Sequence, residues 1–184
     1  MEVPMPVFST PRLSIHPWDP HLDDPAKRYV LKQAIRPMLS DAAMRFLPST
    51  LALGSGPDPL EDWVVARRAA ATVSVIQQQD LTIGLLFLFL PPAAEEGSPI
   101  HLGYLLAEQV WGQGLGSELV AGLIAHLEPG PLCDLQAGVD INNHASARIL
   151  KKSGFVRALE FCADALDVYV RSVGSALSQA GAER

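Results

Sequence analysis

Apolar and polar residues alternate with two different periods along the chain, and the most informative stretch runs from Ile100 to Leu127. It begins with a short apolar run and then passes three glycines, at positions 112, 114 and 116. Apolar residues follow at positions 115, 119, 120, 123, 124 and 127. That spacing is typical of a helix with one buried stripe. The pattern therefore predicts a strand, a glycine-rich loop and a helix in succession.

Other regions predict strands because apolar and polar residues alternate in them. Residues 12–18 alternate in this way, and 72–76 and 81–90 form two β-rich runs joined by a short polar link. The two runs predict a hairpin. In its second strand, the odd-numbered and the even-numbered residues both become apolar, which is typical of a central strand covered on both faces. A further strand is expected over 132–139.

Two helices of the first half are predicted from the chemistry of their first residues. Asp24 precedes Pro25 and Asp58 precedes Pro59, which is the arrangement of an N-cap followed by a first-turn proline. Pro37 must end or kink the first of these helices because proline has no backbone N–H to donate. The segment between the two helices has little pattern, and a segment of that length is usually functional or mobile.

The end of the chain predicts a short helix and a closing hairpin. The helix is expected over 145–152, with Gly154 at the position where helices commonly end in a left-handed residue. The hairpin is expected over 155–161 and 165–173. These elements complete a mixed α/β pattern.

Length and composition favour one compact domain over residues 1–184. The chain has 184 residues, of which 48% are hydrophobic and 18% charged, so it can bury a substantial core but is short for two domains. Residues 1–11 carry three prolines and are expected to be a loose lead-in. Residues 175–184 are small and polar, and are expected to form a disordered tail.

Charge and cysteine usage exclude several classes of function. The formal net charge of −6 argues against a nucleic-acid partner, and it would suit a cationic amine, although it is more readily explained as an ordinary value for solubility. Cys133 and Cys162 lie in apolar runs without a ligand neighbour, which predicts buried thiols in a reducing cytoplasm and no metal site. The longest apolar stretch, 81–94, is too short for a bilayer, so no membrane partner is expected. The N-terminus lacks the pattern of a signal peptide.

The glycine loop predicts an anion site. A loop that feeds a helix N-terminus leaves several backbone N–H groups unpaired, with the positive end of the helix dipole behind them. Glycines lack a Cβ and allow a phosphate to approach those donors. A P-loop is excluded because no lysine stands between 101 and 127. The spacing Gly112, Gly114, Gly116 also departs from the dinucleotide fingerprint, so an oxidoreductase is a distant alternative.

The same loop resembles the acetyl-CoA signature of the GNAT superfamily of N-acetyltransferases, whose general form is Gln/Arg-x-x-Gly-x-Gly/Ala. Trp111 occupies the Gln/Arg position, a departure that the Rim-like branch, which acts on ribosomal-protein N-termini, often shows. The opening Thr10-Pro-Arg-Leu13 is similar to the Thr-x-Arg-Leu start of Rim-like chains. A second block resembles the Asn-x-x-Ser/Ala…Lys-x-Gly-Phe motif of the superfamily, through Asn143, Ser146 and the run Lys152-Ser-Gly-Phe.

The resemblance covers nearly the whole chain, densest over 100–155, and it implies a fold and a cofactor. The implied fold is α/β, with a mixed, mostly antiparallel, seven-stranded splayed sheet and helices on both faces. The implied cofactor is acetyl-CoA, and the segment from Met38 to Gly56 would shape the acceptor cleft. The residues expected to bind the cofactor are Leu105, Leu106, Trp111, Gly112, Gln113, Gly114, Leu115, Gly116, Ser117 and Asn143.

Two residues are candidates for catalysis. By resemblance, Ser146 would hydrogen-bond the CoA sulfur and deliver a proton, although it also fits a first-turn serine that caps the helix. His101 titrates near neutrality and precedes the loop, so it could serve as a base, or it is an exposed strand histidine. A backbone N–H at Leu105 or Leu106 would polarise the carbonyl.

The sequence therefore predicts an acetyl-CoA-dependent N-acetyltransferase that acts on a primary amine, either a protein N-terminus or a small molecule. The alternatives are a small-molecule acetyltransferase of the antibiotic or polyamine type and a non-catalytic acyl-CoA-binding domain, which the lack of an obvious strong base favours. Relatives are often dimers, so the resemblance also implies a homodimer.

Overall fold

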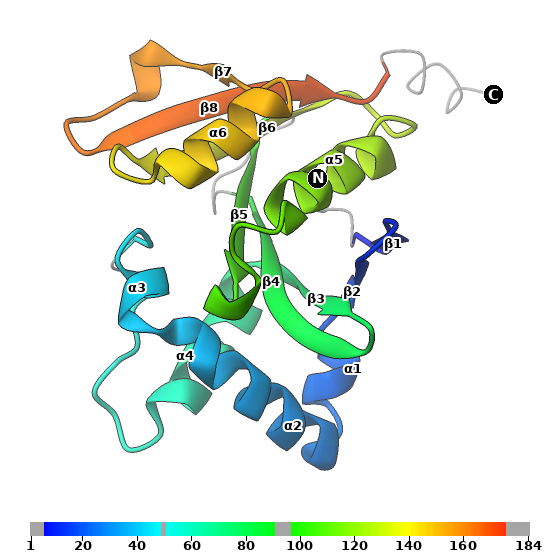
Figure 1. The fold of residues 1–184 in the computed structure, drawn as a ribbon, viewed down its shortest axis with the longest axis vertical. Coiled ribbons are helices and arrows are strands. Elements are labelled where there is room, and N and C mark those ends of the chain that lie inside the picture. The colour runs from blue at the N-terminus through cyan, green and yellow to red at the C-terminus, as the bar shows by residue number, and fades with distance from the viewer. Residues whose placement is uncertain (1–5, 49–50, 91–96, 176–184) are drawn as a thin grey trace.

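A computed structural model describes residues 6–48, 51–90 and 97–175 of the chain. Its eight strands form one sheet in the order β1-β2-β3-β4-β5-β6-β8-β7 (Figure 1). All neighbouring pairs are antiparallel except β5 and β6, which are parallel. The mixed, mostly antiparallel sheet is confirmed. The strand bounds are β1 Phe8–Ser9, β2 Ser14–Pro17, β3 Thr72–Gln78, β4 Leu81–Phe89, β5 Ile100–Leu106, β6 Cys133–Asp140, β7 Val156–Arg157 and β8 Leu166–Val173.

Helices cover both faces of the sheet, as expected. Strand β4 alternates between two hydrophobic clusters, with Leu86 in the one that includes α5 and Leu85 in the one that includes α2 and α4. One face is thus packed by α5 and α6, and the opposite face by the helices of the first half (Figure 1). The helices are α1 Asp19–Leu22, α2 Pro25–Ile35, α3 Asp41–Met44, α4 Pro59–Ala70, α5 Leu115–Leu127 and α6 His144–Lys152, with 3₁₀ turns η1 Arg36–Leu39, η3 Glu108–Val110 and η4 Leu159–Phe161.

The predicted caps are confirmed by their hydrogen bonds. The Asp24 carboxylate accepts from the Lys27 N–H at 2.9 Å, and the Asp58 carboxylate accepts from the Glu61 N–H at 3.1 Å. Helix α2 ends at Ile35, two residues before Pro37, and continues as the turn η1. No helix in the described part of the chain is long and apolar enough to cross a bilayer.

Strands β5 and β6 are paired over a short length only. The partners are Ile100 with Leu135 and His101 with Gln136. Beyond His101, β5 continues to Leu106 alongside β4, and β6 continues to Asp140 alongside β8. The two strands therefore part, and the edge of each that faces the gap has no strand partner there.

Three expectations need correction or lie outside the described residues. The lead-in is not loose from residue 8 onward, because Phe8–Ser9 pairs with β2 and the Phe8 ring stacks on His126 of α5 at 5.4 Å. This short strand raises the strand count from seven to eight. The closing hairpin is also shorter than expected, since the chain after Arg157 turns into η4. Ser175 forms a bridge with Pro131, whereas the rest of the expected tail, 176–184, lies outside the described residues.

Close packing at Gly84 holds β4 against the end of β5 that borders the gap. A Cβ at Gly84 would lie 2.5 Å from the Leu105 carbonyl oxygen and 2.7 Å from Leu106 Cδ2. We expect Gly84→Ala to lower the free energy of unfolding by about 1–3 kcal/mol, the usual cost of overpacking, as measured by urea denaturation. Gly103→Ala is the matched control, because a Cβ there would meet only the side chains of Phe89 and Phe87, at 3.6 Å or more. Equal losses in the two variants would contradict the packing argument.

Candidate active site

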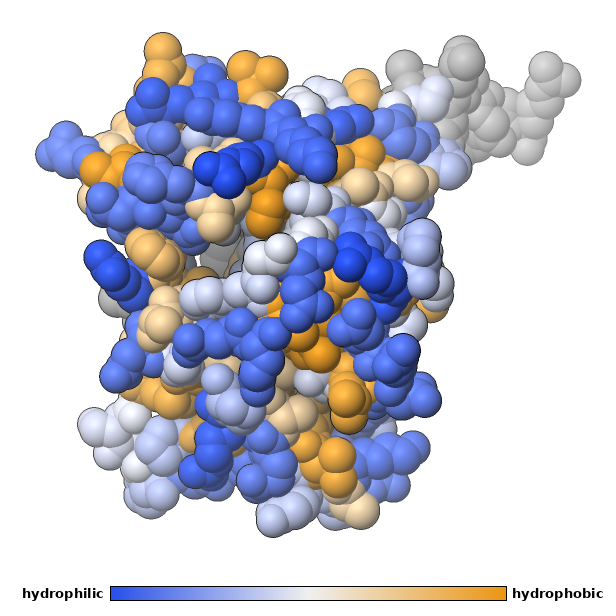
Figure 2. Space-filling view, in the orientation of Figure 1, coloured by the Kyte–Doolittle hydropathy of each residue, from blue (hydrophilic) through white to orange (hydrophobic). Residues whose placement is uncertain are grey.

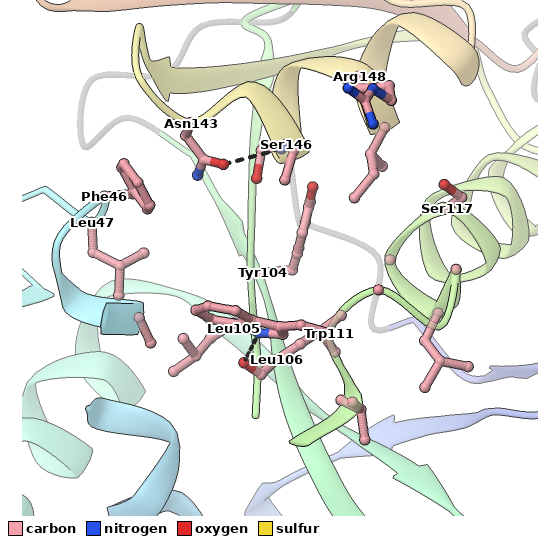
Figure 3. Close-up of a pocket in the computed structure, with 18 residues that line it drawn as sticks. Phe46, Leu47, Tyr104, Leu105, Leu106, Trp111, Ser117, Asn143, Ser146 and Arg148 are labelled. Atoms are coloured by element: carbon pink, nitrogen blue, oxygen red, sulfur yellow. Dashed lines mark hydrogen bonds between the residues drawn. The ribbon is translucent and has the colours of Figure 1, made fainter. Parts of the chain in front are cut away.

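A cavity of about 380 Å³ lies in the gap between the parted ends of β5 and β6. Figure 2 shows the molecule hollowed between its upper part, which holds α6 and β6 to β8, and the part below. Figure 3 shows side chains from several elements turned toward this space. The cavity is lined by Ala43, Phe46, Leu47, Tyr104, Leu105, Leu106, Val110, Trp111, Gly112, Gly114, Leu115, Gly116, Ser117, Asn143, Ala145, Ser146, Arg148 and Ile149.

The cavity is lined from both faces of the sheet. Tyr104 and Leu106 pack against the cluster that contains α5 and α6, and Leu105 belongs to the cluster on the opposite face. Successive side chains of a strand point to opposite faces, so a gap between two strands joins the two sides. A ligand held on the α5 side can therefore reach a second ligand on the side of Ala43 and Leu47.

The glycine loop has the geometry of an anion cradle. Gly112 and Gly114 have φ values of 75° and 78°, in the left-handed region that glycine adopts without strain. Gly114 is the N-cap of α5 and provides no side-chain cap, so the N–H groups of the first turn, at 115–117, lack a capping partner. A Cβ at Gly112 would meet nothing within 4 Å, which leaves room for a ligand. The loop fits a diphosphate in shape and in polarity.

An acidic side chain stands in the first turn of α5, and Arg12 neutralises it. The Glu118 carboxylate accepts from the Thr10 hydroxyl at 2.6 Å, the Arg12 N–H at 2.8 Å and Arg12 Nε at 2.6 Å. Burial would raise the pKa of Glu118, but these hydrogen bonds outweigh it and lower that pKa. Arg12 Nη1 also donates to the Gln113 carbonyl at 3.0 Å, so one guanidinium holds both the loop and the helix.

The remaining residues of the loop are fixed by its own contacts. The Trp111 indole N–H donates to the Leu106 carbonyl at 2.8 Å, which closes the loop onto the end of β5 (Figure 3). Gln113 does not line the cavity, since its carbonyl faces Arg12 and its side chain donates to the Gln109 carbonyl at 3.0 Å. At Gly116, a Cβ would lie 2.8 Å from Ile149 Cδ1, so this glycine also allows α5 to pack closely on α6.

The backbone of β5 presents a donor to the gap. The Ala107 N–H donates to the Ile83 carbonyl of β4 at 2.8 Å. Leu105 lies two residues before Ala107 in the same regular pairing of β4 and β5, so its backbone groups face β4 as well. Antiparallel residues alternate between facing the partner and facing away, so the Leu105 N–H points to β4 and the Leu106 N–H points to the gap. Of the two donors expected from the sequence, only Leu106 is placed to polarise a carbonyl group in the cavity.

Helix α6 contributes Asn143 and Ser146. Asn143 is the N-cap of α6, and its Oδ1 accepts from the Ser146 N–H at 3.1 Å, so only its Nδ2 remains to bind a ligand (Figure 3). The Ser146 side chain points into the cavity beside Tyr104. Burial raises the pKa of Tyr104, and the Ser146 hydroxyl offsets part of that rise.

His101 is not brought into the site. It lies at the paired end of β5, opposite Gln136, and is absent from the cavity lining. Leu105 lies four positions further along the strand, which is about 13 Å at ~3.3 Å per residue. Burial lowers the pKa of His101 and keeps the ring neutral, but no ligand in the cavity is within its reach. The geometry gives no support to the hypothesis that His101 is the base.

Several site residues carry no expectation from the sequence. Ala43, Phe46 and Leu47 line the cavity from α3 and the residues after it, and the Ser40 hydroxyl ties this segment to Glu108 of η3. The resemblance placed the acceptor cleft in this region without naming a residue. Arg148 lies four residues after His144, the first residue of α6, and its position in the sequence does not indicate that it lines the cavity. Of the lining side chains, Tyr104 and Arg148 are the ionisable ones.

These features, a splayed sheet with an uncapped helix N-terminus beside the gap, define an acyl-CoA-dependent acetyltransferase. A model of the GNAT acetyltransferase domain matches residues 12–156, and the chain belongs to that family. Acetyl-CoA is accordingly its acyl donor, and the cradle described above fits the diphosphate of that molecule. The search of curated proteins gave no match.

Solved structures share this fold at low sequence identity. RimL, a ribosomal L7/L12 α-N-protein acetyltransferase in complex with coenzyme A, is 17% identical with a TM-score of 0.64, over 92% of this chain and 97% of that one. The acetyltransferase that modifies the N-terminal serine of L7/L12 in Salmonella typhimurium is 17% identical with a TM-score of 0.62, over 92% and 98%. A GNAT-family acetyltransferase from Bacillus anthracis is 14% identical with a TM-score of 0.64, over 90% and 96%.

The left-handed conformation of Gly114 predicts a specific effect on cofactor binding. An L-residue in that region costs about 1–2 kcal/mol, so Gly114→Ala should turn the first N–H groups of α5 away from the cavity. We expect the dissociation constant for acetyl-CoA to rise about tenfold, as measured by isothermal titration. Gly54→Ala is the control, because a Cβ there would meet nothing within 4 Å and its φ is not positive. Unchanged binding by Gly114→Ala would contradict the role of the loop.

The Arg12–Glu118 pair makes a second prediction about the cofactor. Arg12→Met leaves the Glu118 carboxylate unbalanced beside the expected diphosphate, so affinity for acetyl-CoA should fall about tenfold. The double variant Arg12→Met/Glu118→Gln removes the unbalanced charge and should recover most of that loss. Stability should change by less than about 1 kcal/mol in either case, because the Arg12 side chain is 45% exposed. If the double variant binds acetyl-CoA as weakly as Arg12→Met does, the unbalanced charge of Glu118 is not the cause of the lost affinity.

Proposed function

We propose that this acetyltransferase transfers an acetyl group from acetyl-CoA to the α-amino group of a protein or peptide N-terminus. The observation that carries the proposal is the chemistry of the cavity lining. Its ionisable side chains are Tyr104 and Arg148, and among the described residues no carboxylate or imidazole lines the cavity. The site is therefore suited to an acceptor that needs little help to lose its proton.

The acceptor's own pKa decides how much help it needs. An α-amino group with a pKa near ~8 is about one tenth neutral at pH 7, whereas a lysine side chain near ~10.4 is almost wholly charged. Deprotonating the lysine costs roughly 3 kcal/mol more, at ~1.36 kcal/mol per pKa unit. A water molecule can take the proton of an α-amine, and a lysine acceptor calls for a side-chain base.

Each of the chain's own groups then has one task. The N–H groups at the start of α5 hold the diphosphate, and Asn143 Nδ2 binds the arm of the cofactor. The Leu106 N–H donates to the carbonyl oxygen as negative charge develops on it. Ser146 donates a hydrogen bond to the sulfur as the bond between carbon and sulfur breaks. The proton that the acceptor nitrogen releases passes to water, and the thiolate takes a proton from water.

The acceptor side of the cavity is apolar. Ala43, Phe46 and Leu47 line it, and the charged side chain that the cavity lining holds elsewhere, Arg148 of α6, is positive (Figure 3). A polyamine or aminoglycoside carries several ammonium groups and would favour carboxylates as partners. The lining thus favours a single α-amine followed by an uncharged residue over a multiply charged small molecule. The names of the two neighbours that act on ribosomal L7/L12 support the same class of acceptor.

A panel of acceptors tests the proposal through the release of CoA thiol. Peptides with free N-termini and uncharged first residues should be acetylated. The same peptides with blocked N-termini and an internal lysine, together with spermidine and an aminoglycoside, should react at least about tenfold more slowly. Faster turnover of spermidine or the aminoglycoside would replace the proposal with the small-molecule alternative.

The pH dependence of the same reaction tests the absence of a side-chain base. The value of kcat/KM should rise with pH and level off at the pKa of the acceptor amine, near ~8. A peptide whose N-terminal amine has a lower pKa should level off correspondingly earlier. A break near pH 6.5 that stays fixed across acceptors would instead reveal a histidine base.

A further inference from the structure

The hydroxyl group of Tyr104 is buried and has no hydrogen-bond partner in the part of the chain that the structure describes. A buried hydroxyl without a partner is unfavourable for folding, because it has lost its hydrogen bonds to water. Most buried hydroxyls are therefore paired, and an exception calls for an explanation. In this protein the unpaired hydroxyl lines the active-site cavity.

The direction of the side chain supplies the explanation. Figure 3 shows the Tyr104 ring rising from β5 with its hydroxyl toward Ser146 of α6. The Ser146 N–H is already bonded to Asn143 Oδ1, which fixes the start of α6 and leaves the Ser146 hydroxyl as the group that faces Tyr104. The Tyr104 side chain interacts with that hydroxyl, and Tyr104 stays protonated because burial raises its pKa.

We propose that Tyr104 is a positioning residue that orients the Ser146 hydroxyl toward the thioester sulfur. Tyr104 donates its hydrogen bond to Ser146 Oγ once the cofactor is bound, and this leaves the Ser146 proton free to point at the sulfur. The inference rests on the proposed function, in which Ser146 donates to that sulfur. It adds a residue from β5, on the opposite side of the gap from α6.

The step balances without loss of a proton by either residue. The acceptor nitrogen forms a bond to the carbonyl carbon, the bond between carbon and sulfur breaks, and the electron pair remains on the sulfur. The Ser146 hydroxyl donates a hydrogen bond to that charge, and the Tyr104 hydroxyl donates to Ser146 Oγ. Two hydroxyls in series polarise each other, which strengthens the second hydrogen bond.

Tyr104→Phe tests the inference because it removes the oxygen and keeps the ring. We expect kcat to fall about tenfold while KM for acetyl-CoA stays within about twofold, since the hydroxyl acts on the developing charge and not on the bound ground state. The melting temperature should be unchanged or higher, because the variant loses an unpaired buried hydroxyl. Tyr169→Phe is the matched control on β8, a buried tyrosine outside the cavity, and should retain the wild-type kcat.

Ser146→Ala completes the experiment. If Tyr104 acts through Ser146, then Tyr104→Phe should have almost no further effect in the Ser146→Ala background. A tenfold effect in both backgrounds would overturn the inference, as would an unchanged kcat in Tyr104→Phe or a fall in melting temperature to match the loss in kcat.

A second readout does not depend on the acceptor. The pKa of the CoA thiol, followed by the ultraviolet absorbance of its thiolate while bound, should be lower on the wild type than on Tyr104→Phe or Ser146→Ala. Equal values on the wild type and Tyr104→Phe would overturn the inference. If that difference is present and no peptide N-terminus is acetylated, the proposed acceptor is wrong and the role of Tyr104 stands.

Discussion

The parting of β5 and β6 is the constraint on which the site depends. Two paired positions, Ile100 with Leu135 and His101 with Gln136, hold the strands together before they separate. Separation leaves strand edges without partners, and such edges are costly when they are buried away from water. Here the open edge borders a cavity, and the Leu106 carbonyl on that edge is satisfied by the Trp111 indole. The loop that forms the phosphate cradle thus also closes the end of the strand beside the gap.

The electrostatics of the cradle depend on the start of the chain. A net charge of −6 gives no general attraction for a diphosphate, so attraction must come from local groups. The uncapped N–H groups of α5 supply it, and Glu118 in the same turn would oppose it if unpaired. Arg12, which follows the short strand β1, neutralises that carboxylate, and the Thr10 hydroxyl donates a hydrogen bond to it. Thr10, from the expected lead-in over 1–11, and Arg12, from the start of the expected strand over 12–18, thus contact the first turn of α5.

Local chemistry in the sequence predicted much of the fold and the glycine loop that borders the cavity. Caps at Asp24 and Asp58, the hairpin of β3 and β4, and the strand, glycine loop and helix around Gly114 all follow from neighbouring residues. The contacts that the sequence did not predict join distant segments. Arg12 is 106 positions from Glu118, and Tyr104 meets Ser146 only because β5 and α6 border the same gap. His101 was a plausible base by composition, and its position at the paired end of β5 removes it from the site.

We propose that the first turn of α5 and the open end of β5 bind coenzyme A together. Amide chemical shifts in the ¹⁵N-labelled protein, recorded as coenzyme A is added, test this most directly. We expect the largest changes at Gly112, at Leu115 to Ser117 and at Leu106, with little change at His101 on the paired end of the same strand as Leu106. Changes confined to other parts of the molecule, or no saturable change at the start of α5, would contradict it.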